Sequence, residues 1–139
     1  MIENALLLDA SIAVYAMGQD NPLRDPCRRL LERAAEGEFR AYASTEMIQE
    51  VVHHRLRKTG DRALATRNGR DLAATCTTLA FDREILDLAL DLIERGPTIR
   101  GRDAVHAATA IAYGIERIAS TDSAFDAITG ITRLDPTAL

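Results

Sequence analysis

The alternation of hydrophobic and polar positions predicts short buried strands separated by longer helices. Ala5–Leu8 is a continuous apolar run, typical of a strand buried on both faces, and Arg117–Ser120 has the same character. Arg40–Ala43 and Ile131–Leu134 predict two more strands, the second at an edge of the sheet. This alternation favours an α/β fold, a three-layer α/β/α arrangement around a mostly parallel sheet, with residues 1–139 forming one domain.

Helical periodicity marks the segments between these strands. Ser11 is expected to cap a first short helix, and Ser44 to cap a longer one over 45–57. Asp82 precedes a clear amphipathic pattern, which Gly96 and the following proline end. Residues 60–78 are polar and weakly patterned, so they predict a loop and a helix without definite limits. The remaining predicted helices cover 23–35 and 103–113, the second with Gly114 as its C-cap.

Composition narrows the classes of function. The formal net charge of −4 argues against a protein that holds nucleic acid through a broad basic surface. Cys27 and Cys76 lack a CxxC partner or a histidine at ligand spacing, so reduced thiols are expected and a zinc site is not. No apolar run approaches the roughly 18 to 20 residues that span a bilayer, and the N-terminus lacks the basic flank of a signal peptide. A cytoplasmic protein without a membrane partner is therefore expected.

Four acids lie at the edges of predicted elements. Asp9 and Asp122 follow apolar strands, and ligands of an open parallel sheet bind beyond the carboxyl ends of its strands. Glu50 and Asp103 lie on helices that can reach the same edge. Carboxylates gathered there would repel one another unless cations neutralised them, and their oxygens suit Mg²⁺, or alternatively Mn²⁺. The sequence thus predicts a metal site formed by all four acids.

Each acid also has a purely structural interpretation. Asp9 can be a turn or cap residue, and Glu50 a solvated position at the edge of its helix. Asp103 can be a first-turn charge favoured by the helix dipole, and Asp122 can form an Asx-turn. The metal-site hypothesis therefore depends on the four acids together.

A basic cluster lies between residues 55 and 70, where Asp61 is the only acid. Arginine predominates in it, which suits bidentate contacts to phosphate, although a solvated helix face and loop is the alternative. Its members are Arg55, Arg57, Lys58, Arg62, Arg67 and Arg70.

The order of these motifs resembles the PIN-domain family, and within it the VapC-type ribonuclease toxins of bacterial and archaeal toxin–antitoxin pairs. The resemblance covers essentially the whole chain. Its most specific block is Asp103-Ala104-x-His106-x-Ala108-x-Ala110. The other blocks are the strand followed by Asp9-Ala10-Ser11, Ser44 with Glu50 six residues on, and Ser120-Thr121-Asp122-x-x-Phe125.

The resemblance implies a PIN-like fold and a Mg²⁺-dependent endoribonuclease. Asp9, Glu50, Asp103 and Asp122 would be the catalytic and metal-binding acids. Water would attack an RNA phosphodiester and leave a 5′-phosphate and a 3′-hydroxyl, with one or two ions acting. Nearby residues would have supporting roles. Ser11 and Thr121 would contribute their hydroxyls, and His106 would act through packing or support rather than as a base. Glu46 and Asp126 are substitute acids, and Asp126 could also order a water.

The resemblance also implies partners. A small cognate antitoxin and a second copy of the chain are expected, with the Arg55–Arg70 cluster holding the RNA backbone. Transfer, ribosomal and messenger RNA all stay open as substrates. Adjacent His53 and His54 are expected on the helix surface or in a groove.

Two other classes of protein are alternatives to this hypothesis. Phosphoryl-transfer folds that form an aspartyl phosphate fit poorly, because the haloacid-dehalogenase type needs a second Asp where this chain has Ser11. Receiver domains need an acidic pair before the phosphorylated Asp and a late lysine, and both are missing. A catalytically weak or inactive PIN-fold module that binds RNA or a partner protein is the stronger alternative.

Overall fold

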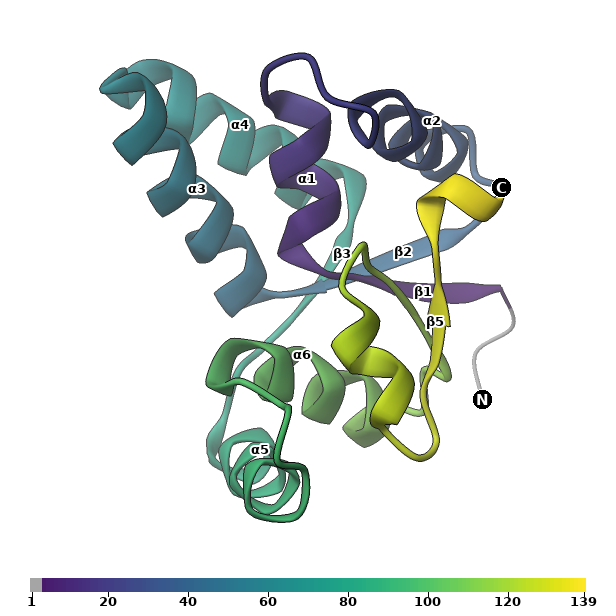
Figure 1. Ribbon diagram of the computed structural model, residues 1–139. Coiled ribbons are helices and arrows are strands. Elements are labelled where there is room, and N and C mark those ends of the chain that lie inside the picture. The colour runs from purple at the N-terminus through teal and green to yellow at the C-terminus, as the bar shows by residue number, and fades with distance from the viewer. Residues whose placement is uncertain (1–3) are drawn as a thin grey trace.

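A computed structural model describes residues 4–139, in which strands and helices alternate as the apolar pattern predicts (Figure 1). The strands are β1 (Ala5–Leu8), β2 (Arg40–Ser44), β3 (Thr77–Leu79), β4 (Arg117–Ala119) and β5 (Thr132–Leu134). The α-helices are α1 (Ala10–Met17), α2 (Arg24–Ala35), α3 (Thr45–Thr59), α4 (Arg62–Thr75), α5 (Arg83–Arg95) and α6 (Gly101–Ala112). Two short 3-10 helices are η1 (Ser123–Ala127) and η2 (Pro136–Ala138).

All strand pairings in the sheet are parallel, in the order β3-β2-β1-β4-β5. The apolar β1 is central and is buried along its whole length. Leu8 pairs with Ala119 at the carboxyl ends of β1 and β4, so the next residues, Asp9 and Ser120, lie side by side. The predicted parallel sheet is confirmed, and its topology creates the crevice in which the acids were expected.

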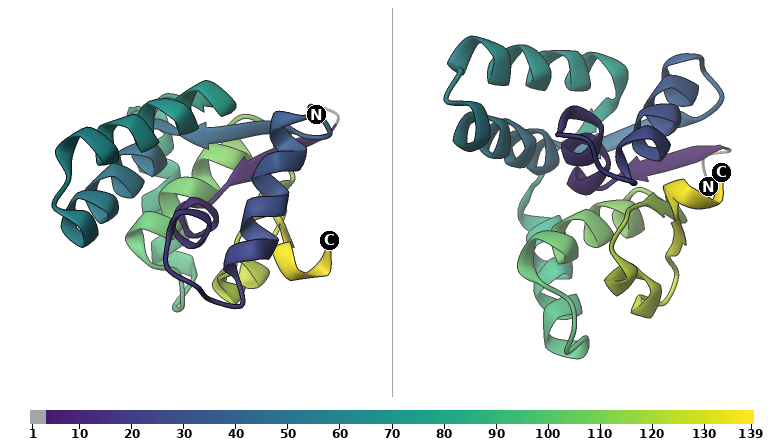
Figure 2. Two further views of the ribbon diagram at one scale, coloured as in Figure 1. Left: turned by 90° about the horizontal axis from the view of Figure 1, so that it is seen from above. Right: turned by 45° about the horizontal axis from the view of Figure 1, so that its top comes forward.

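Successive side chains of β1 point to opposite faces and divide the core into two layers. Leu6 and Leu8 pack in the cluster that contains α1, α2 and α3, and Leu7 packs in the cluster that contains α6. Helix α4 lies outside α3, and α5 lies outside α6 (Figures 1 and 2). The three-layer α/β/α arrangement predicted from the sequence is confirmed.

The segment 60–78 is more regular than its sequence indicates. Helix α3 ends where Gly60 adopts φ +65°, and Asp61 caps α4 by accepting a hydrogen bond from the backbone N–H of Leu64. The short strand β3 follows and was not predicted, because two of its three side chains are exposed threonines and only Leu79 is buried. Pairing with β2, rather than an apolar pattern, makes β3 a strand.

The prediction that Ser11 caps the first helix is wrong. Helix α1 begins at Ala10, with Asp9 in the N-cap position and without a side-chain cap. The hydroxyl of Ser11 donates a hydrogen bond to the Asp9 carboxylate instead. Helix α6 also ends differently from the prediction, since Tyr113 is its C-cap and Gly114 lies one residue beyond, at φ +71°. The expected caps Ser44 and Asp82 are confirmed.

Cys27 and Cys76 are buried free thiols, and burial raises the pKa of each to about 11. Within residues 4–139, every helix is too short or too polar to cross a membrane.

Candidate active site

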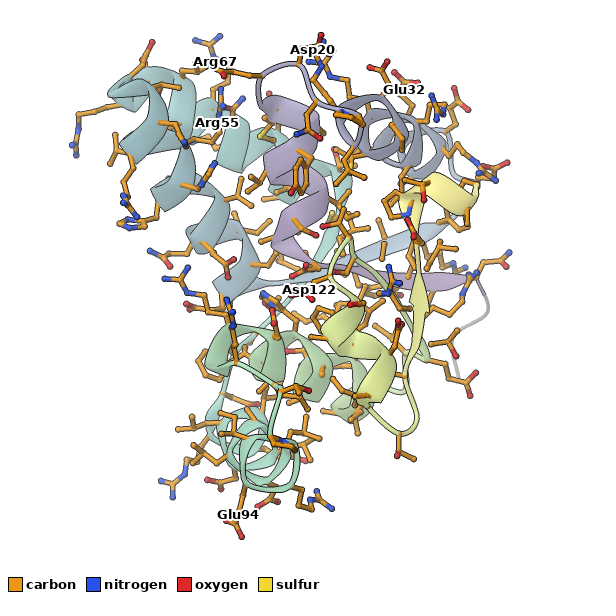
Figure 3. The ribbon with its side chains drawn as sticks, in the orientation of Figure 1. Asp20, Glu32, Arg55, Arg67, Glu94 and Asp122 are labelled. Atoms are coloured by element: carbon orange, nitrogen blue, oxygen red, sulfur yellow. The ribbon has the colours of Figure 1, made fainter. Side chains whose placement is uncertain are left out.

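The four predicted acids line one cleft of about 530 Å³ beside the carboxyl ends of β1 and β4. Asp9 follows β1 and Asp122 lies just beyond β4, while Glu50 comes from α3 and Asp103 from the first turn of α6. Figure 3 shows Asp122 between the helices on one side of the sheet and α6 on the other. Segments more than a hundred residues apart in the sequence thus contribute to a single acidic cleft.

Two serine hydroxyls hold the Asp9 carboxylate in place. The Oδ2 atom of Asp9 accepts hydrogen bonds from Ser11 Oγ at 2.8 Å and from Ser120 Oγ at 2.7 Å. The side chain is almost fully buried, so these bonds replace the water that a carboxylate would otherwise bind. Its Oδ1 atom makes neither bond and lies 3.8 Å from His106 Nε2. Asp9 therefore has a fixed orientation within the cleft.

Ser120 is a site residue that the sequence reasoning missed. Its buried hydroxyl contacts Asp9 and accepts a hydrogen bond from the backbone N–H of Asp122 at 3.0 Å. The predicted residue Thr121 lines the cleft, and its backbone N–H donates to Ser11 Oγ at 3.2 Å. The sequence signal that could have indicated Ser120 is its position directly after an apolar strand, which is also the position of Asp9.

His106 connects the helices α3 and α6 to the acids. It is fully buried, with Nε2 3.4 Å from Glu50 Oε1 and Nδ1 3.2 Å from Ser44 Oγ. Ser44 Oγ already accepts from the backbone N–H of Met47, so its proton is free to be donated to Nδ1. That arrangement leaves the ring proton on Nε2, facing Glu50 and Asp9. His106 is thus placed to orient two carboxylates.

The pKa of Asp103 is sensitive to its burial and to the acids around it. Burial, followed by the charges of Asp9 and Asp122, raises the pKa of Asp103 from 3.8 to about 6. The nearby His106 lowers it and Glu50 raises it further. An isolated first-turn acid would not experience these repulsions, so the cleft is a site where a cation would be stabilised.

Asp122 and Asp126 have different surroundings. Asp122 is exposed and caps η1, because its Oδ1 atom accepts from the backbone N–H of Ala124 at 2.9 Å. Its second carboxylate oxygen makes no such cap bond. Both oxygens of Asp126 bind the guanidinium of Arg133, at 2.9 and 3.3 Å, and Asp126 is not among the described residues lining the cleft. The structure therefore does not bring Asp126 to the four acids.

The basic cluster is divided between two places. Arg55 and Lys58, on α3, line a second cleft of about 510 Å³ that adjoins the acidic one and shares Val14 and Tyr15 with it. The side chain of Arg55 is held by Asn68 Oδ1 at 3.2 Å. The other members are exposed on the end of α3 and on α4: Arg57, Arg62, Arg67 and Arg70. Figure 3 shows Arg55 and Arg67 on these two helices.

The donor set of the acidic cleft is consistent with Mg²⁺ or Mn²⁺. All its charged side chains offer oxygen, and the buried Glu50 Oε1 atom has no hydrogen-bond partner among residues 4–139. Within the same residues, however, no three His, Cys, Asp or Glu side chains are already close enough together to hold a metal ion. The acids are grouped around the cleft, and closing them on a cation would require side-chain adjustments.

The sequence matches the PIN domain family over residues 6–131, and the chain belongs to this family. Within the family it resembles VapC proteins over nearly its whole length. It is 35% identical over 136 residues to Ribonuclease VapC7 of Mycobacterium tuberculosis, covering 96% of this chain and 92% of that one. It is also 30% identical over 129 residues to Ribonuclease VapC13 of the same organism, covering 93% and 98%.

A solved structure supports the same fold. FitAcB from Neisseria gonorrhoeae superposes with a TM-score of 0.75 over 96% of this chain and 99% of that one, at 18% identity. The PIN-like fold expected from the sequence is therefore confirmed.

Proposed function

We propose that this protein is a Mg²⁺-dependent endoribonuclease, the toxin of a type II toxin–antitoxin system, with residues 1–139 forming one PIN-like domain. The main support is the convergence of Asp9, Glu50, Asp103 and Asp122 on one cleft, where burial and then the charges of the neighbouring acids raise the pKa of Asp103. The names of the similar mycobacterial proteins support ribonuclease activity independently.

The same acids are the proposed metal ligands, with Mn²⁺ as an alternative ion. When bound, the ion would polarise the phosphoryl oxygens, lower the pKa of water and stabilise the leaving oxygen. The residues of the chain supply a prearranged acidic cleft: Ser11 and Ser120 orient Asp9, and His106 faces Glu50. Water is the nucleophile in this proposal, so no covalent intermediate with a side chain is formed. The products are a 5′-phosphate and a 3′-hydroxyl.

Cleavage of RNA by purified protein tests this function. We expect cleavage of single-stranded RNA with Mg²⁺, loss of cleavage in EDTA, and at least a hundredfold loss in Asp103→Asn, because the variant lacks one ligand charge. The matched control is Asp91→Asn, which makes the same chemical change at an exposed position on α5. Cleavage that persists in Asp103→Asn at the rate of Asp91→Asn would contradict the assignment of the site.

The alternative, an inactive PIN-fold binding module, gives a different result in the same experiment. The wild type would bind RNA or a partner protein but cleave no RNA with Mg²⁺ or Mn²⁺. Retention of all four acids in one cleft favours the enzyme, because a binding module has no need of a group of carboxylates that repels phosphate.

RNA and an antitoxin are the proposed partners, in the cytoplasm. The basic cluster of Arg55, Arg57, Lys58, Arg62, Arg67 and Arg70 would contact the RNA backbone, with Arg55 and Lys58 nearest the acids because they line the adjoining cleft. A structure with the same fold is a toxin–antitoxin complex from Klebsiella pneumoniae, and it motivates the antitoxin proposal.

We propose that the chain forms a homodimer and that α5 contacts the second copy. The outer face of α5 exposes an apolar stripe at helical spacing, formed by Leu86, Leu90 and Ile93. Packing of two α5 helices against each other would cover the stripe of both copies.

A further inference from the structure

The second cleft lies directly beside the acidic one and differs from it in charge. Its walls come from the end of α1, the loop before α2, and α3. Val14 and Tyr15 line both clefts, so the two clefts adjoin each other along α1. Whatever polymer lies at the acids can therefore extend into the second cleft without leaving the surface.

Helix α3 carries the change in charge from one cleft to the next. Glu50, His54 and Lys58 recur every four residues and so lie along one face of the helix. Glu50 lines the acidic cleft, while His54 and Lys58 line the second one. At 1.5 Å per residue, about 12 Å of helix separates Glu50 from Lys58. This face thus offers an acid for a cation and, farther along, a positive charge for a second phosphate.

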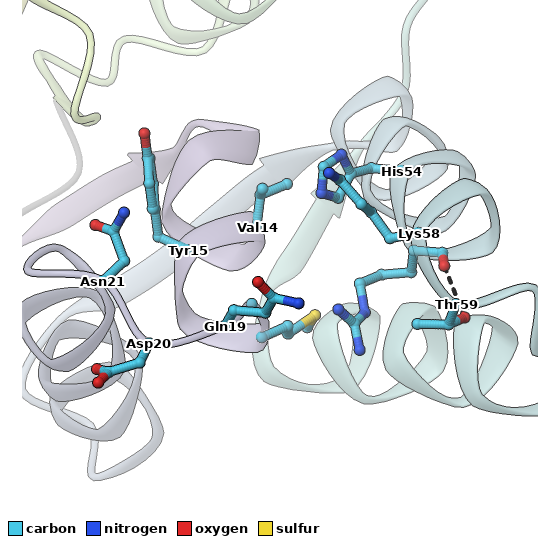
Figure 4. Close-up of a pocket in the computed structure, with 11 residues that line it drawn as sticks. Val14, Tyr15, Gln19, Asp20, Asn21, His54, Lys58 and Thr59 are labelled. Carbon is cyan, nitrogen blue, oxygen red and sulfur yellow. Dashed lines mark hydrogen bonds between the residues drawn. The ribbon is translucent and has the colours of Figure 1, made fainter.

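The remaining walls suit a nucleobase. Figure 4 shows Val14 between Tyr15 and Asn21 on one side and His54 and Lys58 on the other. Tyr15 provides an aromatic face, Val14 an apolar floor, and the amides of Gln19 and Asn21 provide hydrogen-bonding groups. Asn21 Oδ1 is already bound to the backbone N–H of Leu23, which leaves the Asn21 amide N–H groups for a ligand.

The charges around this cleft favour an anionic ligand. Burial and then Lys58, Arg55 and Arg57 lower the pKa of His54 below 6.5. Near neutral pH, the positive charge of the cleft therefore comes from Lys58 and Arg55 rather than from His54. Asp20 is the acid on the lining, and it lies at the exposed rim, where it pairs with Arg24 at 3.4 Å. The volume, about 510 Å³, is within the range of pockets that hold small ligands, roughly 300–1,000 Å³.

We infer that this second cleft is a subsite for one unpaired nucleotide next to the scissile phosphate, with the base between Tyr15 and Asn21 and the phosphate near Lys58 and Arg55. The inference rests on the proposed ribonuclease function and makes it more specific. It assigns selection of the RNA to the end of α1 and the following loop, and it requires a single-stranded substrate, because a paired base cannot enter the cleft.

Sequencing the product ends from a randomised single-stranded RNA, cut with Mg²⁺, tests the base contact. We expect the wild type to prefer certain bases at one position beside the cut. Asn21→Ser, which retains an oxygen to accept from Leu23, and Tyr15→Leu are expected to flatten the preference at that position by a larger factor than they lower the overall rate of cleavage. An unchanged preference in both variants would overturn the subsite.

Kinetics of Lys58→Gln tests the phosphate contact. We expect about a fivefold or larger rise in KM with little change in kcat, and a weaker dependence on salt, with the slope reduced by about 0.7 for one lost contact to a single strand. Arg29→Gln is the matched control, since it removes the same charge from an exposed position on α2 away from both clefts. Equal effects of the two substitutions would overturn the inference, because nonspecific electrostatic attraction between the protein and RNA would then explain binding.

A binding measurement separates this inference from the proposed function. If the wild type cleaves no RNA, the ribonuclease proposal fails, but anisotropy of a fluorescein-labelled random RNA hexanucleotide in EDTA still tests the cleft. Weaker binding by Lys58→Gln and Tyr15→Leu than by Arg29→Gln would support an RNA subsite. Equal binding by all three variants would overturn it.

Discussion

The Nε2 atom of His106 lies 3.4 Å from the Oε1 atom of Glu50, and both atoms are buried without a hydrogen bond to any described residue. The pair joins α6 to α3 across the sheet edge, while Ser44 holds the opposite side of the imidazole ring. A small movement of Glu50 would complete the contact between them. We therefore propose that His106 positions the acids, which is the supporting role that the sequence resemblance implied.

Replacing His106 by alanine is expected to impair both the site and the fold. Removal of the ring leaves Glu50 without its facing group, and loss of comparable supporting residues lowers metal affinity or activity by about 10- to 100-fold. Loss of the hydrogen bond between Ser44 and the ring leaves the buried Ser44 hydroxyl without this partner, at a cost of about 1–3 kcal/mol of stability. Urea unfolding and cleavage measured against Mg²⁺ concentration check this, and a Mg²⁺ requirement equal to that of the wild type would contradict the positioning role.

The raised pKa of Asp103 predicts a pH-dependent stability in the absence of metal. Its pKa is about 6 in the folded protein, whereas an aspartate in an unfolded chain titrates near 3.9. Between these values the folded protein binds more protons than the unfolded chain, so the free energy of unfolding falls as pH rises. We expect this decline from about pH 4 to about pH 6 in EDTA, and a smaller one in Asp103→Asn. Urea unfolding at stepped pH measures the difference between the two proteins, which would be zero if the pKa of Asp103 were not raised by folding.

Addition of Mg²⁺ is expected to raise the Tm of the wild type. A ligand that binds only the folded state stabilises it, by about 2.7 kcal/mol at one hundred times its Kd. Asp103→Asn should show a much smaller rise, while the exposed control Asp91→Asn should respond as the wild type does. Thermal unfolding followed by circular dichroism gives the three curves. Equal shifts in all three proteins would mean that the ion binds elsewhere.

Asp9, Asp103 and Asp122 were predictable because each lies close to the end or the start of an element that the sequence pattern predicts, whereas Glu50 lies within α3. Asp9 directly follows an apolar strand, and a parallel sheet then determines the edge at which it lies. The contacts between the site residues were not predictable in this way. Ser120 bonds to Asp9 across 111 positions and Ser44 to His106 across 62, and such pairings depend on strand order. The strand β3 was missed for a similar reason, because pairing with β2 outweighs its polar composition.

A close approach of α3 and α4 depends on Gly69. A Cβ atom at this position would lie 2.4 Å from Val52 Cγ2, and a valine in a helix has little freedom to rotate away. Gly69→Ala is therefore expected to destabilise the protein, because overpacking costs about 1–3 kcal/mol and the gain in helix propensity is about 1 kcal/mol. In a Val52→Ala background the clash is absent, so the same substitution should become neutral or stabilising. Urea unfolding of the four proteins completes this cycle, and additive effects would contradict the contact.

The apolar stripe on α5 predicts that a charged residue placed in it would prevent dimer formation. Leu90 is the most exposed of its three residues, at 52%, so Leu90→Glu should leave the fold intact while placing a carboxylate from each copy at the interface between the two α5 helices. We expect the wild type to have twice the monomer mass by size-exclusion chromatography with light scattering, and Leu90→Glu to have the monomer mass. Leu139→Glu is the matched control, since Leu139 is 41% exposed and lies outside α5. A dimer that withstands Leu90→Glu would show that the second copy binds another surface.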